Sequence, residues 1–231
     1  MKQQIVQQLG YKMEELPFKY LGVPLYTKKM FVMQWYPLIE KIMPRINSWT
    51  ARKLSYAGRT QLVQTILFGV QAYWTQLFRF SAKVIKLIES MCRSYLWSGV
   101  GKVTRKALIA WERVCRPKNE GGMGLINMQV WNRARIAKLC WDLANKEDKL
   151  WIKWIHAYYL RGQNEWQKRE QASWMIRKIM NAKQIVDQVH LKEGKGMAKK
   201  IYDYLREEQT KPDWKCLMFQ NAARPKAIFT L

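Results

Sequence analysis

Hydrophobic side chains recur at every third or fourth position along most of the chain, which is the spacing of helices with one buried face. In residues 30–49 these positions run from Trp35 to Ile46, and Pro44 is expected to kink the helix. The other predicted helices cover residues 56–79, 82–97, 128–145, 148–160, 173–189 and 197–208, with Ser173 as an expected N-cap. The pattern therefore predicts a mostly α fold.

Prolines and glycines interrupt this pattern. Residues 11–26 contain Pro17, Gly22 and Pro24 and are predicted to be extended. In the middle of the chain we expect a loop at 99–102, a short strand at 106–111 and a tight turn at 121–124, whose glycines would supply positive φ. The middle of the chain is thus predicted to be irregular, with a small hairpin.

The predicted helix at 56–79 requires a membrane test, because no charge occurs between Arg59 and Arg79. A polar stripe runs along it, formed by Gln61, Gln64, Gln71 and Thr75. Its expected apolar face consists of Leu62, Val63, Ile66, Val70, Tyr73, Trp74 and Leu77. Glutamines would lack partners in lipid, so we predict a water-facing amphipathic helix, and no membrane partner. The first ten residues also lack the apolar core of a secretory signal.

Charge is the strongest compositional signal. The 231 residues include 41 Lys and Arg against 17 Asp and Glu, a net charge of +24 that is spread along the whole chain. Such a surface attracts polyanions, which makes nucleic acid the first expected partner and an acidic membrane surface the second. The candidate nucleic-acid-binding residues are Lys28, Lys29, Arg52, Lys53, Arg59, Arg105, Lys106, Arg133, Arg135 and Lys138.

Aromatic residues are also abundant, with 12 Trp and 11 Tyr. Most of them are expected in the core, because their rings carry large apolar areas. Some could serve as stacking platforms for nucleic-acid bases. Composition alone does not separate these two roles.

The sequence contains few candidate catalytic residues. Acidic residues are adjacent only at positions 14–15, 147–148 and 207–208, and each pair has the context of a solvated surface. No Ser-His-Asp or Cys-His set can be assembled, and His156 is expected to be a packing histidine. The four cysteines are scattered without zinc-ligand spacing, and are expected to be free and mostly buried. We therefore expect no catalytic residues, no metal, no cofactor and no small-molecule substrate.

Short motifs in order along nearly the whole chain resemble the region after the palm of plant LINE-type reverse transcriptases, the enzymes of non-LTR retrotransposons. They lie at residues 16–25 (LPFKYLGVPL), 38–42, 46–49, 54–59 (LSYAGR), 93–99 (RSYLWSG), 110–115, 117–118, 120–125 (EGGMGL), 131–134, 150–154 and 173–174. Trp214, residues 223–226 and Phe229 resemble the opening of the reverse-transcriptase zinc-binding domain.

The resemblance implies a helical thumb-like region at 1–98, a connector at 99–127, a helical linker at 128–193 and, at 194–231, the start of a zinc-binding-type domain without its ligands. In this family the polymerase carboxylates lie upstream in an aromatic-x-Asp-Asp turn, and this chain contains no Asp-Asp pair. The chain is thus expected to be a truncated, non-catalytic fragment. The resemblance also implies an intracellular, nuclear location.

The family's thumb packs along the primer–template duplex, which implies RNA or DNA as the partner, with Arg52, Lys53 and Arg59 as the foremost phosphate contacts. No base-reading motif accompanies them, so binding is expected to be non-specific. Two alternatives remain open. The chain could be a structural module that packs against a missing palm domain or an acidic partner, with an exposed apolar patch on the 62–78 helix. It could also be an enzyme, which would require a carboxylate cluster assembled from distant residues.

Overall fold

The structure is a computed structural model that describes residues 10, 18–20, 23–25, 32–48, 53–75, 79–100, 102, 108–160, 174–189 and 196–206. Two short strands, β1 (Phe18–Tyr20) and β2 (Val23–Leu25), pair antiparallel within the segment predicted to be extended. The main helices are α2 (Tyr36–Asn47), α4 (Tyr56–Gly69), α6 (Ala82–Ser98), α7 (Trp111–Val114), α8 (Met128–Ala144), α9 (Leu150–Ile155), α10 (Trp174–Asn181), α11 (Lys183–Gln188) and α12 (Met197–Leu205). The predicted mostly α class is confirmed.

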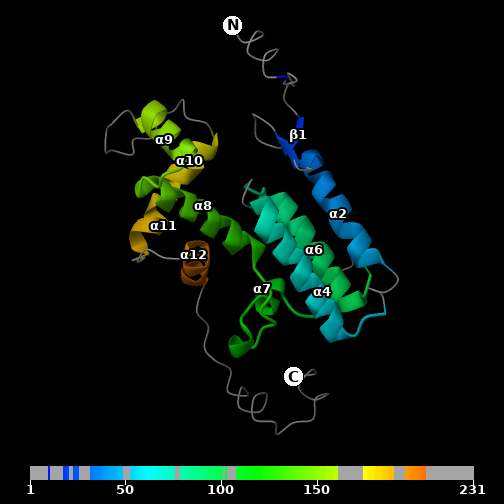
Figure 1. The fold of residues 1–231 in the computed structure, drawn as a ribbon. Helices are drawn as coiled ribbons and strands as arrows, with labels where there is room; N and C mark the ends of the chain where they lie inside the picture. The colour runs from blue at the N-terminus through cyan, green and yellow to red at the C-terminus, as the bar shows by residue number, and fades with distance from the viewer. Residues whose placement is uncertain are drawn as a thin grey trace.

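The first hydrophobic core lies among α2, α4 and α6, and α4 and α6 run side by side (Figure 1). The predicted buried positions of α2 are confirmed, since Leu38, Ile42 and Ile46 are buried. The helix continues through Pro44 to Asn47. A 3₁₀ turn, η1 (Val32–Trp35), precedes α2. It places the ring centroid of Trp35 4.5 Å from that of Phe80.

Side-chain caps fix where these helices start. Ser55 and Ser81 accept hydrogen bonds from the backbone N–H groups of Gly58 and Val84, three residues into α4 and α6. Asn127 does the same at α8 with two backbone N–H groups. Each cap satisfies donors that the first helical turn leaves without intrahelical partners.

The amphipathic helix predicted at 56–79 differs from the structure at its end. Gln61 and Gln64 are exposed as expected, but Thr75 is 5 % exposed. After α4 the backbone forms a π-helical turn, η2 (Val70–Trp74), whose wider winding breaks the 3.6-residue period and turns Thr75 inward. There Trp131 Nε1 donates to Thr75 Oγ1 at 3.2 Å. Among the described residues, no helix combines the length and apolarity that crossing a bilayer requires.

The connector is built from turns. A strand predicted at 106–111 is wrong over the described part of that range, because residues 108–110 are irregular and Trp111 begins α7. Trp111 is 3 % exposed, and packing of this ring into the first core outweighs its strand propensity. The predicted glycine turn is confirmed, with positive φ at Gly121 and Gly124. A Cβ on Gly122 would lie 2.1 Å from the Arg116 carbonyl oxygen.

The second core surrounds α8, against which α10, α11 and α12 pack (Figure 1). The helix predicted to run from Ser173 to 189 is instead two helices, because the chain turns at Ala182 and buries it. Ser173 itself lies outside the described residues. The helix predicted at 148–160 is α9 followed by a π-helical turn, η4 (His156–Leu160).

Helix α8 connects the two cores. Its residue Asn132 donates to the Phe80 carbonyl at 3.1 Å and accepts from the Phe80 N–H at 3.2 Å. The Asn127 N–H donates to the Tyr202 hydroxyl at 3.1 Å, which ties the start of α8 to α12. The domain boundaries expected from the sequence stay predictions, and within the described residues the change from one core to the other falls along α8.

Candidate nucleic-acid interface

The candidate phosphate contacts fall into two described regions. Lys53 and Arg59 lie at the start of α4, whereas Arg133, Arg135 and Lys138 lie on α8. The other five candidates, Lys28, Lys29, Arg52, Arg105 and Lys106, lie outside the described residues. The assignment of all ten to nucleic-acid binding stays a prediction, and the environments of the described ones differ sharply.

Arg59 is half-buried and holds two helices together. Its Nε donates to the Leu54 carbonyl at 3.1 Å. Its guanidinium also covers Gly99, the C-cap of α6, so closely that a Cβ there would lie 2.7 Å from Nη2. Gly99 has φ 72°, which glycine adopts without strain. A phosphate at Arg59 would therefore bind a guanidinium that already has a packing role. Lys53, just before α4, is exposed.

On α8, Arg133 is exposed, but Arg135 points toward the protein. Burial lowers the pKa of Arg135, and the nearby Asp142 partly offsets that effect. Its Nε is buried without a hydrogen-bond partner among the described residues. Arg135 is thus placed less favourably than Arg133 for binding a polyanion from solvent.

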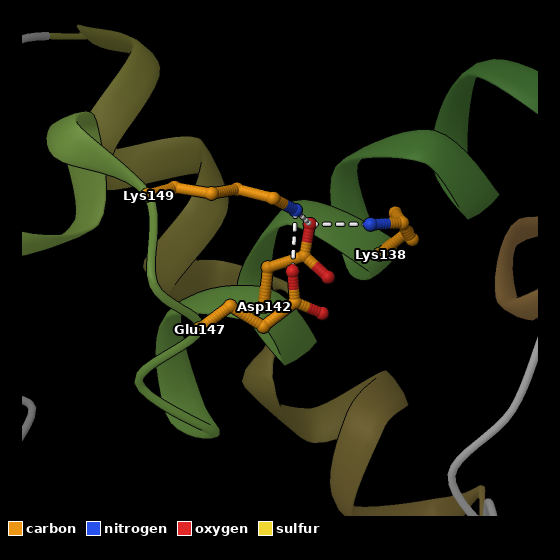
Figure 2. A network of polar contacts seen from close by, with 4 residues as sticks. All are labelled: Lys138, Asp142, Glu147 and Lys149. Atoms are coloured by element: carbon orange, nitrogen blue, oxygen red, sulfur yellow. Dashed lines mark hydrogen bonds and ion pairs between the residues drawn. The ribbon is translucent and has the colours of Figure 1, made fainter.

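Lys138 belongs to a network of ion pairs at the turn between α8 and α9 (Figure 2). Its Nζ lies 2.5 Å from Oδ2 of Asp142, whose side chain is 2 % exposed, and Lys149 Nζ lies 3.0 Å from the same oxygen. Glu147 also pairs with Lys149. Hydrogen bonding, first to Glu147 and then to Asp142, raises the pKa of Lys149. The two lysines balance the two carboxylates, so this cluster adds little net charge to the surface.

The described surface nevertheless carries many exposed cations. The exposed basic residues are Lys41, Arg45, Lys53, Lys83, Lys86, Lys102, Arg113, Lys118, Arg133, Lys146, Lys153, Arg177, Lys183, Lys199 and Lys200, whereas the exposed acidic residues are Glu40, Glu112, Asp148, Asp187 and Asp203. The bases clearly outnumber the acids. A polyanion would therefore meet a positive surface over several helices.

Sequence reasoning missed part of this surface. Lys41 and Arg45 are exposed one turn apart on α2, and Lys83 and Lys86 are exposed in the first turns of α6. None of them forms the adjacent basic pair that draws attention in a sequence. For Lys83 and Lys86, helical phase is the signal that would have found them, since both lie opposite the buried positions of α6, whereas Lys41 and Arg45 flank the buried stripe of α2.

The buried titratable groups do not assemble a reactive cluster. Glu89 on α6 is 8 % exposed, and burial raises its pKa to about 7. The thiols of Cys92, Cys115 and Cys140 are free and buried, as predicted, and burial raises the pKa of Cys92 to about 12. Within the described part of the chain, no three His, Cys, Asp or Glu side chains are grouped as metal ligands. His156 Nε2 forms a hydrogen bond of 3.0 Å with the Leu143 carbonyl, a structural role in keeping with the packing histidine expected from the sequence.

Two plant proteins are similar to this chain. The first, named "Putative ribonuclease H protein At1g65750" of Arabidopsis thaliana, is 26% identical over 141 residues, which are 61% of this chain and 23% of that protein. The second, "Uncharacterized mitochondrial protein AtMg00310" of the same plant, is 22% identical over 138 residues, 58% of this chain and 90% of that protein. No family model matches the chain, and no solved structure matches it.

The chain thus spans less than a quarter of the length of the first relative. It is distantly related to retroelement-related plant proteins. At these identities the relationship gives the broad origin of the chain, and neither an activity nor a ligand follows from it.

Proposed function

We propose that this chain is the post-palm part of a LINE-type reverse transcriptase and that it binds nucleic acid non-specifically along a primer–template duplex. The motifs of the sequence and the distant retroelement-related relatives support the assignment. The observation that carries the binding is the excess of exposed Lys and Arg over exposed Asp and Glu on the described helices. A nuclear location belongs to the same proposal.

Electrostatics would supply most of the affinity. Lysines and arginines that neutralise phosphates release counterions, so binding depends steeply on salt and little on base sequence. The exposed cations lie on α2, α6, α8, α10 and α12, and they form no motif that reads base edges. A protein of this kind binds a duplex without sequence specificity.

We also propose that the chain lacks polymerase activity by itself. Two-metal phosphoryl transfer requires clustered carboxylates. The sequence has no Asp-Asp pair, and the adjacent acids Glu147 and Asp148 are each paired with a lysine, Lys149 and Lys153. Each carboxylate already has a cationic partner, and Glu147 belongs to the ion-pair network of the α8–α9 turn.

A protein-docking role is the second candidate, and the exposed side of α4 and η2 favours it. On α4, Phe68 is 61% exposed, and its exposed neighbours Gln61, Gln64, Thr65 and, on η2, Ala72 carry no charge. An uncharged strip with an exposed ring, in a protein of net charge +24, suits a protein surface better than a phosphate backbone. Under this alternative, addition of a palm domain would improve solubility, and Phe68→Ser would improve it without any partner.

The test is fluorescence anisotropy of the purified chain with a labelled RNA–DNA hybrid at about 50 and about 200 mM salt. Several phosphate contacts predict a loss of affinity on the order of 10³ across that range. A folded, soluble chain that fails to bind at the lower salt would refute the nucleic-acid role and leave the docking role. Primer extension on the same hybrid should give no product, and extension by the chain alone would overturn the non-catalytic assignment.

A further inference from the structure

One group of aromatic rings lies outside both cores. On α9 and η4, Trp154 is 53% exposed and Tyr158 is 62% exposed. Trp154 is the only exposed tryptophan among the described residues, and the other described tryptophans are buried or half-buried. Two large exposed rings next to each other form an aromatic patch, and such patches are more typical of interaction sites than single exposed side chains are.

The two rings are held parallel. Their planes differ by 4° and their centroids are 5.5 Å apart, which is an offset stack. Tyr159 meets both rings edge-on, at 5.5 Å from Trp154 and 5.0 Å from Tyr158. The outer rings therefore have a fixed orientation before any ligand arrives.

The inner side of the same helix fixes its position. Ile152 and Ile155 are 1 % and 4 % exposed in the second core, and Tyr159 packs against that core. The hydrogen bond between His156 and the Leu143 carbonyl ties η4 to the end of α8. In Figure 1, α9 lies near one end of α8, and its residues Lys153 and Trp154 are exposed.

Charge next to the rings favours a polyanionic ligand. Lys153, one residue before Trp154, has a 68% exposed side chain and pairs with Asp148, which is 86% exposed. Exposed pairs of this kind are weak, so a phosphate can replace the carboxylate. Lys146, in the turn before α9, is also exposed. The chain as a whole carries +24.

We infer that Trp154 and Tyr158 form a stacking platform for the bases of single-stranded nucleic acid, with Lys153 beside them for the backbone. The inference deepens the proposed function and rests on it, because the duplex-binding cations supply the general attraction. Stacking on exposed aromatic faces is the usual way in which proteins hold unpaired strands without reading sequence. The platform would hold the unpaired template or displaced strand next to the gripped duplex.

The test compares two labelled strands of about 12 nucleotides at about 50 mM salt, one of thymidines and one of abasic residues. Both strands carry the same phosphates, and only the first can stack. The full chain should bind the thymidine strand about 10-fold more tightly, as expected for one or two stacked bases. Trp154→Ala should remove most of this ratio and leave binding of the abasic strand and of the RNA–DNA hybrid unchanged.

Matched variants distinguish the possible outcomes. Trp154→Phe keeps a ring and should keep most of the ratio, whereas Tyr204→Ala, which removes a 52% exposed tyrosine on α12, should leave it intact. Equal binding of the two strands, or a ratio that Trp154→Ala does not change, overturns the platform while the duplex-binding proposal stands; the rings would then belong to a protein interface. If neither strand nor the hybrid binds, both proposals fall.

Discussion

Among the described residues, one carboxylate is buried in each region, Glu89 in the first and Asp142 in the second, and their surroundings differ. Glu89, on α6 in the first region, has no ion pair with a described residue, and burial raises its pKa to about 7. Asp142, on α8 in the second region, lies against two lysines. A buried carboxylate is either neutralised by a proton or balanced by a cation. Glu89 follows the first course and Asp142 the second.

Individual lysines show a similar contrast, although both regions carry exposed cations. In the first region, Lys83 and Lys86 are exposed in the first turns of α6, where a phosphate can reach them. In the second region, Lys138 and Lys149 are engaged by Asp142. A high net charge therefore does not make every lysine a binding residue. Three experiments test this contrast.

The largest expected effect concerns Glu89. Because its folded-state pKa of about 7 lies above its ordinary value of 4.5, the folded protein binds more protons than the unfolded chain between these values. Stability should therefore fall as pH rises through this window, by about 3 kcal/mol in total. Glu89→Gln should abolish this decline, as measured by urea unfolding at several pH values.

Glu112→Gln, at an exposed neighbour on α7, is the matched control and should retain most of the decline, because burial is the main cause of the raised Glu89 pKa and repulsion from Glu112 a smaller one. A wild-type protein whose stability stays flat from pH 5 to 8 relative to Glu89→Gln would show that Glu89 remains ionised in the fold. Glu89 would then be balanced as Asp142 is, and the contrast between the two regions would disappear.

A smaller loss is expected for Asp142→Asn. Removal of the carboxylate leaves Lys138 and Lys149 close together without their shared partner, and the second core should lose about 2 kcal/mol. The figure is modest because both lysines keep access to water. Unfolding by urea measures it, and Asp187→Asn, at an exposed position on α11, should change stability by less than about 0.5 kcal/mol. Equal losses in the two variants would remove the special role of the network.

The smallest expected effect is on binding. Lys83→Glu combined with Lys86→Glu should weaken affinity for the RNA–DNA hybrid about 10-fold, about 1.4 kcal/mol, with little change in stability. Lys138→Glu should do the reverse, with lower stability and nearly unchanged affinity, because that lysine is already neutralised. If the two variants gave the same profile, the distinction between exposed and engaged lysines would have no functional meaning.

Much of the fold could be predicted because helical periodicity is a local property. The buried face of α2, the start of α4 after Ser55 and the glycine turn at Gly121 all follow from spacing and backbone preferences. The errors lie where packing outweighs such preferences. Trp111 enters a helix because its ring fills the first core, and η2 shifts the helical phase so that Thr75 meets Trp131. Neither contact is visible in a local window.

The candidate interface was predicted only in outline. The prediction that grouped the basic residues of the 128–145 helix included Arg133, which is exposed, but also Lys138, which is held by Asp142. The prediction from sequence did not include Lys83 and Lys86. Each of them lacks a basic neighbour in the sequence, but both are exposed on one face of α6. Sequence supplies the number of charges, whereas the partner of each charge depends on how the helices pack.

The sequence by itself determined the mostly helical class, the placement of most helices and the strongly basic character, because composition and local periodicity contain that information. Only the tertiary structure decided which lysines face solvent, which buried carboxylate has no ion pair with a described residue and that Trp154 and Tyr158 stack outside the core. Those outcomes depend on contacts between residues far apart in the chain, and burial changes the free energy of a charge or a ring by amounts that no local pattern specifies.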